Sequence, residues 1–229
     1  MEENGIFIKP IAHIKTDFKE KFGIPRQSGR VETLKGKIVF TPEYRNPDAL
    51  RELEGFSHIW LIFDFSKAHK ETWSPTVRPP RLGGNKKIGV FASRSPFRPN
   101  PLGLSSVKLE EILQTEKEVT VLMVSCIDIL DNTPIYDIKP YLPFADCHID
   151  AVGGYADKFK EHKLNVVFSD NLLEKIPPHS RETVVRCLEE DPRPSYQNDD
   201  RVYSMRFSDF DIRFTVKNDI LKVIEIAEI

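Results

Sequence analysis

The chain has 229 residues, of which 40% are hydrophobic and 30% charged, and its formal net charge is −2 at pH 7. This composition supports a buried core and excludes a globally disordered chain. The near-neutral charge gives no bulk signal for a nucleic-acid-binding or membrane-surface protein, and no apolar run is long enough to predict a transmembrane helix.

The N-terminus and the cysteines favour a cytoplasmic protein without a metal. The first residues, MEENGIFIKPIAHIKTDF, lack the basic start and apolar stretch of a secretory signal. Cys126, Cys147 and Cys187 are widely spaced and form no CxxC pair, which argues against a zinc site and a disulfide framework. We therefore expect reduced thiols that act as small core residues. The histidines show no metal-ligand spacing.

Strand-like patterns dominate the first two thirds of the chain. In HIWLIFDF (58–65) every second residue is apolar, which predicts a strand with one buried face. Further strands are predicted at residues 35–40, 87–94, 104–112 and 118–130. Residues 46–53, NPDALREL, predict a short helix with Asn46 as N-cap. Many strands without crossover helices favour a mainly β fold, a small β-barrel rather than a Rossmann sheet.

The composition changes after about residue 150. Residues 150–163 contain a Gly pair and indicate a linker or short helix. Residues 180–190 predict a helix with Ser180 as N-cap. Residues 201–216 and 220–226 predict two strands. We expect a β-barrel domain over residues 1–152 and a small α+β appendage over residues 153–229.

Positive charge is concentrated in one part of this near-neutral chain. No acid occurs between Glu71 and Glu110, whereas the interval contains Arg78, Arg81, Lys86, Lys87, Arg94, Arg98 and Lys108. Such a stretch can bind phosphates, because arginine offers a planar fork for them. A solvated face paired with acids elsewhere explains the same pattern.

Three stiff loops are candidate binding elements. SRSPFRPNPLGLS (93–105) contains three prolines, which fix an extended loop that loses little entropy on binding a ligand. DNTP (131–134) is a turn at the end of a predicted strand, where ligands often bind. DPRPSY (191–196) repeats the proline stiffening and adds an aromatic ring that can stack on a base. Each loop also has a purely structural alternative. The first can be a rigid corner, the second a hairpin turn and the third a helix stop. Phosphate-binding GxxxxGK[ST], GxGxxG, HExxH and GxSxG are absent.

Six blocks in order resemble the TrmO family: PRQSG, LEGFSHIWLIF, RPPRLGG, GVFASRSPFRPNPLGLSSVKL, DNTPIYDIKPYLPFAD and DPRPSY. The resemblance covers nearly the whole chain. It implies a β-barrel enzyme, usually a homodimer, that uses S-adenosylmethionine to methylate a tRNA. The expected target is N6 of a threonylcarbamoyladenosine at position 37, next to the anticodon.

The resemblance also implies roles for single residues. The expected cofactor-binding residues are Pro25, Arg26, Gln27, Ser66, Lys67, Arg94, Leu104, Asp131, Asn132, Thr133 and Pro134. Ser66 and Lys67 carry the weakest part of the match, because relatives have other residues there. Asp191 and Tyr196 are expected on the catalytic, nucleotide side. With a tRNA as substrate, we expect the basic stretch and the DPRPSY segment to supply the tRNA-binding residues, namely Arg78, Arg81, Lys86, Lys87, Arg98 and Arg193. A non-catalytic RNA-binding barrel and a small-molecule methyltransferase are the rival functions.

Overall fold

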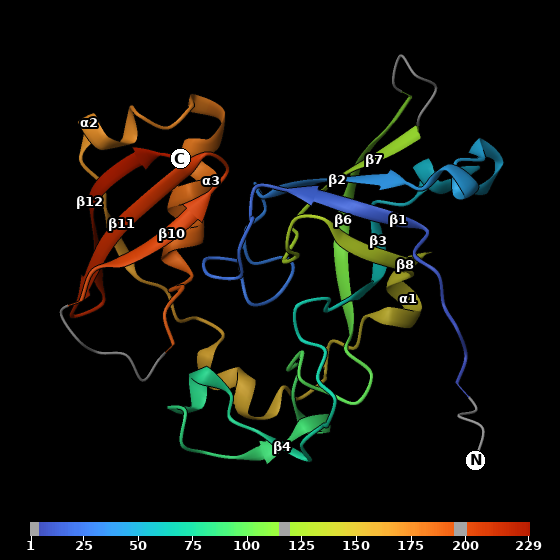
Figure 1. Ribbon diagram of the computed structural model, residues 1–229, viewed down its shortest axis with the longest axis horizontal. Coiled ribbons are helices and arrows are strands. Elements are labelled where there is room, and N and C mark those ends of the chain that lie inside the picture. The colour runs from blue at the N-terminus through green and yellow to red at the C-terminus, as the bar shows by residue number, and fades with distance from the viewer. Residues whose placement is uncertain (1–4, 115–119, 195–200) are drawn as a thin grey trace.

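The computed structural model describes residues 5–114, 120–194 and 201–229 and contains a closed six-stranded barrel beside a smaller sheet-and-helix unit (Figure 1). The barrel order is β1-β2-β7-β6-β3-β8, and its pairings are antiparallel. Its strands are β1 (Ala12–Thr16), β2 (Lys35–Phe40), β3 (His58–Asp64), β6 (Leu102–Gln114), β7 (Thr120–Ser125) and β8 (Thr133–Pro140). The mainly β prediction is confirmed.

Period-two patterns explain the barrel. Ile59, Leu61 and Phe63 of β3 point inward and are buried, as the alternation predicts. On β6 the exposed and buried residues alternate from Leu102 to Val107, so this strand also has one inner and one outer face. Closure leaves the barrel without an unpaired edge.

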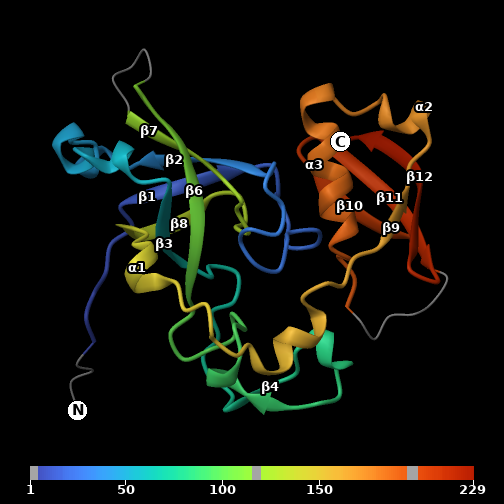
Figure 2. The ribbon, with the colours of Figure 1, turned by 180° about the vertical axis from the view of Figure 1, so that it is seen from behind.

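The second unit packs a helix against a four-stranded sheet, in which β10 (Tyr203–Phe207), β11 (Phe210–Lys217) and β12 (Ile220–Glu228) are antiparallel and β9 (Asn165–Val167) runs parallel to β12. Figure 2 shows α3 (Pro178–Glu189) lying against this sheet. Thr183, Val184, Cys187 and Leu188 form the buried face of α3. The remaining elements are α1 (Pro143–Asp146), α2 (Asp170–Leu173), β4 (Thr76–Val77) and β5 (Ile88–Gly89).

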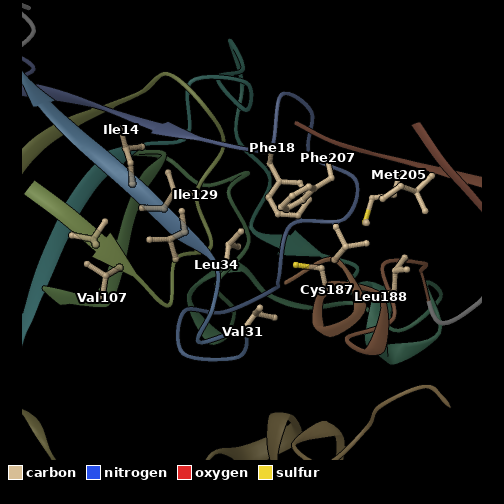
Figure 3. Packing of buried hydrophobic residues seen from close by; sticks show 14 of the residues in the cluster. Ile14, Phe18, Val31, Leu34, Val107, Ile129, Cys187, Leu188, Met205 and Phe207 are labelled. Carbon is tan, nitrogen blue, oxygen red and sulfur yellow. The ribbon is translucent and has the colours of Figure 1, made fainter. Parts of the chain in front are cut away.

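One hydrophobic core runs through both units (Figure 3). Phe18, from the segment after β1, contacts Phe207 of β10 edge to face, with ring centroids 5.4 Å apart. Met205, Cys187 and Leu188 continue this core on the side of the smaller unit. The segment after β1 therefore belongs to the core of both units.

Several predicted elements differ in the structure. The strand predicted at residues 87–94 is wrong, because only Ile88–Gly89 is extended and a 3₁₀ turn follows at Val90–Ala92. The run at residues 118–130 stops being a strand after Ser125, because Cys126 has a left-handed φ of 63°. Burial, not strand pairing, explains the apolar Ile127 and Ile129.

The appendage and two smaller details also need correction. The helix predicted at residues 180–190 begins at Pro178 with Pro177 as N-cap, so Ser180 lies inside it. The predicted strand at residues 201–216 is two strands, separated by a turn at Ser208. Asn46 does cap a turn through its side chain, but the turn, Pro47–Leu50, is 3₁₀. Cys147 is exposed rather than a core residue.

Candidate functional site

One end of the barrel gathers the loops that carry the predicted site residues. Because neighbouring strands are antiparallel, the segments after β1, β3 and β7 emerge at the same end as those before β2, β6 and β8. In Figure 1 the segment between β1 and β2 leaves this end toward the smaller unit. The topology thus brings segments far apart in sequence to one place.

A cavity of about 430 Å³ opens at this end. Five of the predicted cofactor residues line it, namely Ser66, Lys67, Asp131, Asn132 and Pro134, together with His13, Lys19 and Leu130. Thr133 is buried beneath it, and its hydroxyl donates to the carbonyl of Leu130 at 2.7 Å. The volume lies within the usual range for small-molecule sites.

The turn 131–134 is held rigidly in that cavity wall. Asp131 accepts a hydrogen bond from the Thr16 amide and one from Lys19, each at 2.9 Å. Burial acts to raise the pKa of Asp131, but these two donors outweigh it, so its pKa lies below the usual value. Asn132 has a φ of 60°, and its backbone amide donates to the backbone carbonyl of Ile14 at 2.8 Å. The turn therefore presents a fixed and charged carboxylate.

The other predicted residues include Gln27, Arg94 and Leu104, which do not line this cavity. The Arg94 guanidinium donates to the side-chain oxygen of Gln27, which joins the loop 25–28 to the proline-rich loop 93–101. Leu104 lies on the outer face of β6 with 57% of its surface exposed. These residues do not line the cavity of Asp131, so the predicted cofactor residues form two groups in the chain.

The sequence reasoning missed Asp128, which lies beside this second group. Ser105 donates to its carboxylate at 2.6 Å. Burial raises the pKa of Asp128, against the opposing effects of Ser105, the Ser28 amide and the charge of Arg94. The one signal in the sequence is an acid within the otherwise apolar run CIDIL. Perturbed carboxyl groups of this kind often lie at functional sites.

The loop 25–28 is also tied to the smaller unit. Arg26 donates to the backbone carbonyl of Arg193 at 2.7 Å. Pro25 and Arg26 line a small cavity of about 80 Å³ together with Lys21, Asp191 and Pro192, among others. Two predicted cofactor residues thus lie at the contact between the barrel loops and the DPRP segment.

Asp191 and Arg193 are buried there in a shared ion-pair network, which we call the Asp191 cluster (Arg81, His162, Asp191 and Arg193). Asp191 accepts from Arg193 Nε at 2.9 Å, and its other oxygen lies 3.2 Å from His162 Nε2 and 3.9 Å from Arg81. Burial acts to raise the pKa of Asp191, but Arg193, His162 and Arg81 outweigh it, so the pKa is lowered. The contacts observed here join the two units. The nucleotide-side roles expected for Asp191 and Arg193 stay predictions, and Tyr196 lies outside the described residues.

The predicted tRNA-binding residues separate in the structure. Arg78, Lys86 and Lys87 are exposed between β4 and β5, as a phosphate-binding surface requires. Arg81 instead donates to the carbonyl of Glu190 at 2.9 Å. Arg98 donates to the carbonyls of Ser93 and Ser95, at 3.2 and 3.4 Å, so its guanidinium braces its own loop.

Two further findings concern the described residues alone. They contain no group of three or more His, Cys, Asp and Glu that could hold a metal ion. No helix in the described part of the chain is long and apolar enough to cross a membrane.

Comparisons with known proteins cover nearly all of this chain. The family models for the tRNA-methyltransferase O N-terminal domain and the TrmO C-terminal domain match residues 13–147 and 161–229. The chain is 41% identical to the tRNA (adenine(37)-N6)-methyltransferase of Escherichia coli, over 90% of this chain and 91% of that protein. It is 38% identical to the putative S-adenosylmethionine-dependent methyltransferase RcsF of Pseudomonas aeruginosa, over 96% and 97%.

A solved structure agrees with these sequence matches. The crystal structure of TrmO from Pseudomonas aeruginosa superimposes with a TM-score of 0.80 at 33% identity, covering 99% of both chains. Sequence and structure thus agree over the barrel and the smaller unit together. The chain belongs to the TrmO family of tRNA methyltransferases.

Proposed function

We propose that this protein transfers the methyl group of S-adenosylmethionine to N6 of the adenosine at position 37 of tRNA. The observation that carries the proposal is the match, over 90% of this chain, to a relative named for that reaction. The lining of one cavity by five of the predicted cofactor residues is consistent with it. We further propose that the target adenosine carries a threonylcarbamoyl group, as the resemblance implies.

The residues at the barrel end fit S-adenosylmethionine. Its ribose hydroxyls and amino group need acceptors, and Asp131 offers a carboxylate held ionised by Lys19. Its carboxylate and adenine need donors and apolar contacts, which Arg94, Gln27 and Leu104 supply. The cofactor supplies an electrophilic methyl group on a sulfonium, so the protein contributes mainly position and orientation.

The predicted cofactor residues lie in two separate groups. We propose that the Asp131 cavity and the Arg94–Gln27 pair bind different parts of the cofactor. In a homodimer, which the resemblance implies, the two groups can come from different protomers. The exposed Leu102 and Leu104 on the outer face of β6 would then gain a partner surface. Light scattering of the purified protein tests the dimer directly.

The adenine N6 needs little further chemistry. Its lone pair is delocalised into the ring, so an oxygen that accepts an N6–H would localise the pair and orient it. The anticodon loop is single-stranded, so the base can be splayed out without melting a duplex. We place the tRNA backbone on the exposed Arg78, Lys86 and Lys87.

The domain boundary near residue 152 and a cytoplasmic location are further parts of the proposal.

The test is transfer from methyl-labelled S-adenosylmethionine to bulk tRNA, followed by digestion and nucleoside mass spectrometry. We expect one new labelled nucleoside, N6-methyl-threonylcarbamoyladenosine. tRNA lacking the threonylcarbamoyl group serves as the control, and equal labelling of it would overturn the proposed substrate. Absence of any label, from tRNA carrying the precursor, would contradict the activity. It would favour an RNA-binding module.

A further inference from the structure

The proline-rich loop presents an aromatic ring to solvent beside two lysines. Phe97 is 42% exposed, and Lys70 Nζ lies 4.3 Å from its ring centroid. Lys21 Nζ lies 6.0 Å from the same centroid. We call these three residues the Phe97 patch. Neither the family resemblance nor the two cavities assigns a role to Phe97.

One residue of the patch, Lys21, connects it to both cavities of the site. Lys21 lines the small cavity beside Asp191 and also donates to the backbone carbonyl of Lys67 at 2.9 Å. Lys67 lines the larger cavity. Lys21 of the Phe97 patch therefore contacts residues of both cavities.

The backbone that carries the ring is held in place. The Phe97 backbone amide donates to Ser95 Oγ at 3.2 Å, and Pro96 precedes Phe97 in the chain. Beyond it, the Phe65 amide donates to the carbonyl of Pro101 at 2.8 Å, which anchors the loop to the end of β3. Stacking on a fixed ring costs less entropy than stacking on a mobile one.

The chemistry of the patch selects among possible ligands. Lys70 Nζ lies over the Phe97 ring, so a base that stacks on this face has to displace the ammonium, which can then bind a phosphate of the same ligand. Among the described ion pairs none involves Lys21, Lys67 or Lys70, so this charge is not neutralised by a nearby acid. The partner is thus an anion with a flat apolar group.

We propose that the Phe97 patch is a nucleotide subsite for the tRNA. An unpaired base of the anticodon loop next to the target adenosine stacks on Phe97, and the adjoining phosphates bind Lys21 and Lys70. The proposal rests on the proposed function, because it assumes that the anticodon loop is the substrate. It adds a contact that positions the RNA without touching the reacting atoms.

The experiment measures tRNA binding and cofactor binding separately in Phe97→Ala, Phe97→Trp and Lys70→Ala. We expect Phe97→Ala to raise the Kd and KM for tRNA roughly tenfold, as loss of one stacked base does, and Phe97→Trp to restore them. Lys70→Ala should reduce the salt slope of tRNA binding by about one. The Kd for S-adenosylmethionine should not change. Phe144→Ala is the control, because this ring on α1 is 88% exposed and does not belong to the Phe97 patch.

A direct readout is a 2-aminopurine placed beside adenosine 37 in an anticodon stem-loop. Its fluorescence should be quenched by the wild type and less by Phe97→Ala. Unchanged tRNA affinity in Phe97→Ala, or an altered cofactor Kd, would overturn the subsite. Lys70→Ala keeps the test decisive if Phe97→Ala misfolds, since an unchanged salt slope then counts against it. If the wild-type protein binds tRNA but transfers no methyl group, the proposed function is rejected and the subsite is not, because the subsite is measured by tRNA binding.

Discussion

At the scale of single residues, the carboxylates near the barrel end differ in their surroundings. Asp131 faces Lys19 and keeps a lowered pKa, whereas burial raises the pKa of Asp128. The two acids lie on one short segment, yet only Asp131 lines the larger cavity. We infer that Asp128 acts by holding the loop 25–28 through Ser28 and Ser105, rather than by touching the cofactor.

Substitution of Asp128 should therefore weaken cofactor binding indirectly. Asp128→Ala removes the acceptor for Ser105 and for the Ser28 amide, and we expect the Kd for S-adenosylmethionine to rise about tenfold, the usual scale for a hydrogen bond to a charged group. Isothermal calorimetry measures this. Asp137→Ala, which removes an exposed acid paired with Lys139 on β8, is the control. Equal Kd values for the two variants would contradict the inference.

At the scale of elements, the segment between β1 and β2 connects the core to the site. Phe18 and Gly23 pack against Phe207 and Met205 of β10, and Arg26 then reaches the DPRP segment. Gly23 has a φ of 97°, and a Cβ there would lie 2.5 Å from the Met205 side chain. Only glycine satisfies both conditions without a shift of the loop.

Gly23→Ala should lower the free energy of unfolding by about 2–3 kcal/mol, since it combines a left-handed φ with overpacking. Gly29→Ala is the matched control, because Gly29 has a φ of 78° but a Cβ added there would meet no atom within 4 Å. It should cost about 1 kcal/mol. Urea unfolding of both variants separates backbone strain from the clash. Equal losses of unfolding free energy would show that the Met205 side chain moves aside without a measurable loss of stability.

The Asp191 cluster should contribute strongly to stability. Asp191→Asn removes the buried carboxylate that Arg81, His162 and Arg193 share, so we expect a loss of about 3 kcal/mol at pH 7. Because the pKa of folded Asp191 lies below its ordinary 3.8, this contribution is complete above pH 3.8. It is lost as the pH falls through the lowered pKa.

Urea unfolding of wild type and Asp191→Asn between pH 7 and pH 3 should therefore show a difference that shrinks only at the acid end. Asp48→Asn breaks an exposed pair with Arg51 and should cost less than about 0.5 kcal/mol. A difference that already disappears near pH 6 would mean that another group controls the stability of this cluster.

At the scale of the whole molecule, the charge is divided between surfaces although the total is near zero. Arg78, Lys86 and Lys87 form an exposed positive surface between β4 and β5, whereas Arg81 and Arg193 are used inside the fold. Counting basic residues along the sequence does not separate these two uses. Of these five residues, Arg78, Lys86 and Lys87 are the exposed ones, as a phosphate-binding surface requires.

The double variant Lys86→Ala with Lys87→Ala should weaken tRNA binding several-fold and lower its salt slope by about 1–2, because each lysine neutralises at most one phosphate. Cofactor affinity should stay at the wild-type value. Filter binding between 50 and 200 mM salt measures the slope. The same double change at the exposed Lys217 and Lys222, on the smaller sheet, is the control, and an equal effect there would indicate nonspecific attraction.

Local pattern predicted the barrel class and four of its six strands, but it missed β1 and β8 and predicted the site only in part. Alternation located β2, β3 and β6, but it failed at residues 87–94, where only Val90 is buried and glycine and serine interrupt the run. The resemblance named residues of the Asp131 cavity. Asp128 and the Phe97 patch were not predicted, because they depend on which segments meet when the barrel closes, and sequence spacing does not contain that information.

The shared core has a consequence for synthesis of the protein. Phe18 is made early, but its partner Phe207 is made near the end of the chain. β1 likewise waits for β8 before the barrel can close. Such distant contacts fold slowly, so the loop 25–28 reaches its working shape only after nearly the whole chain has left the ribosome. A nascent chain stalled before β10 should hold no competent cofactor site.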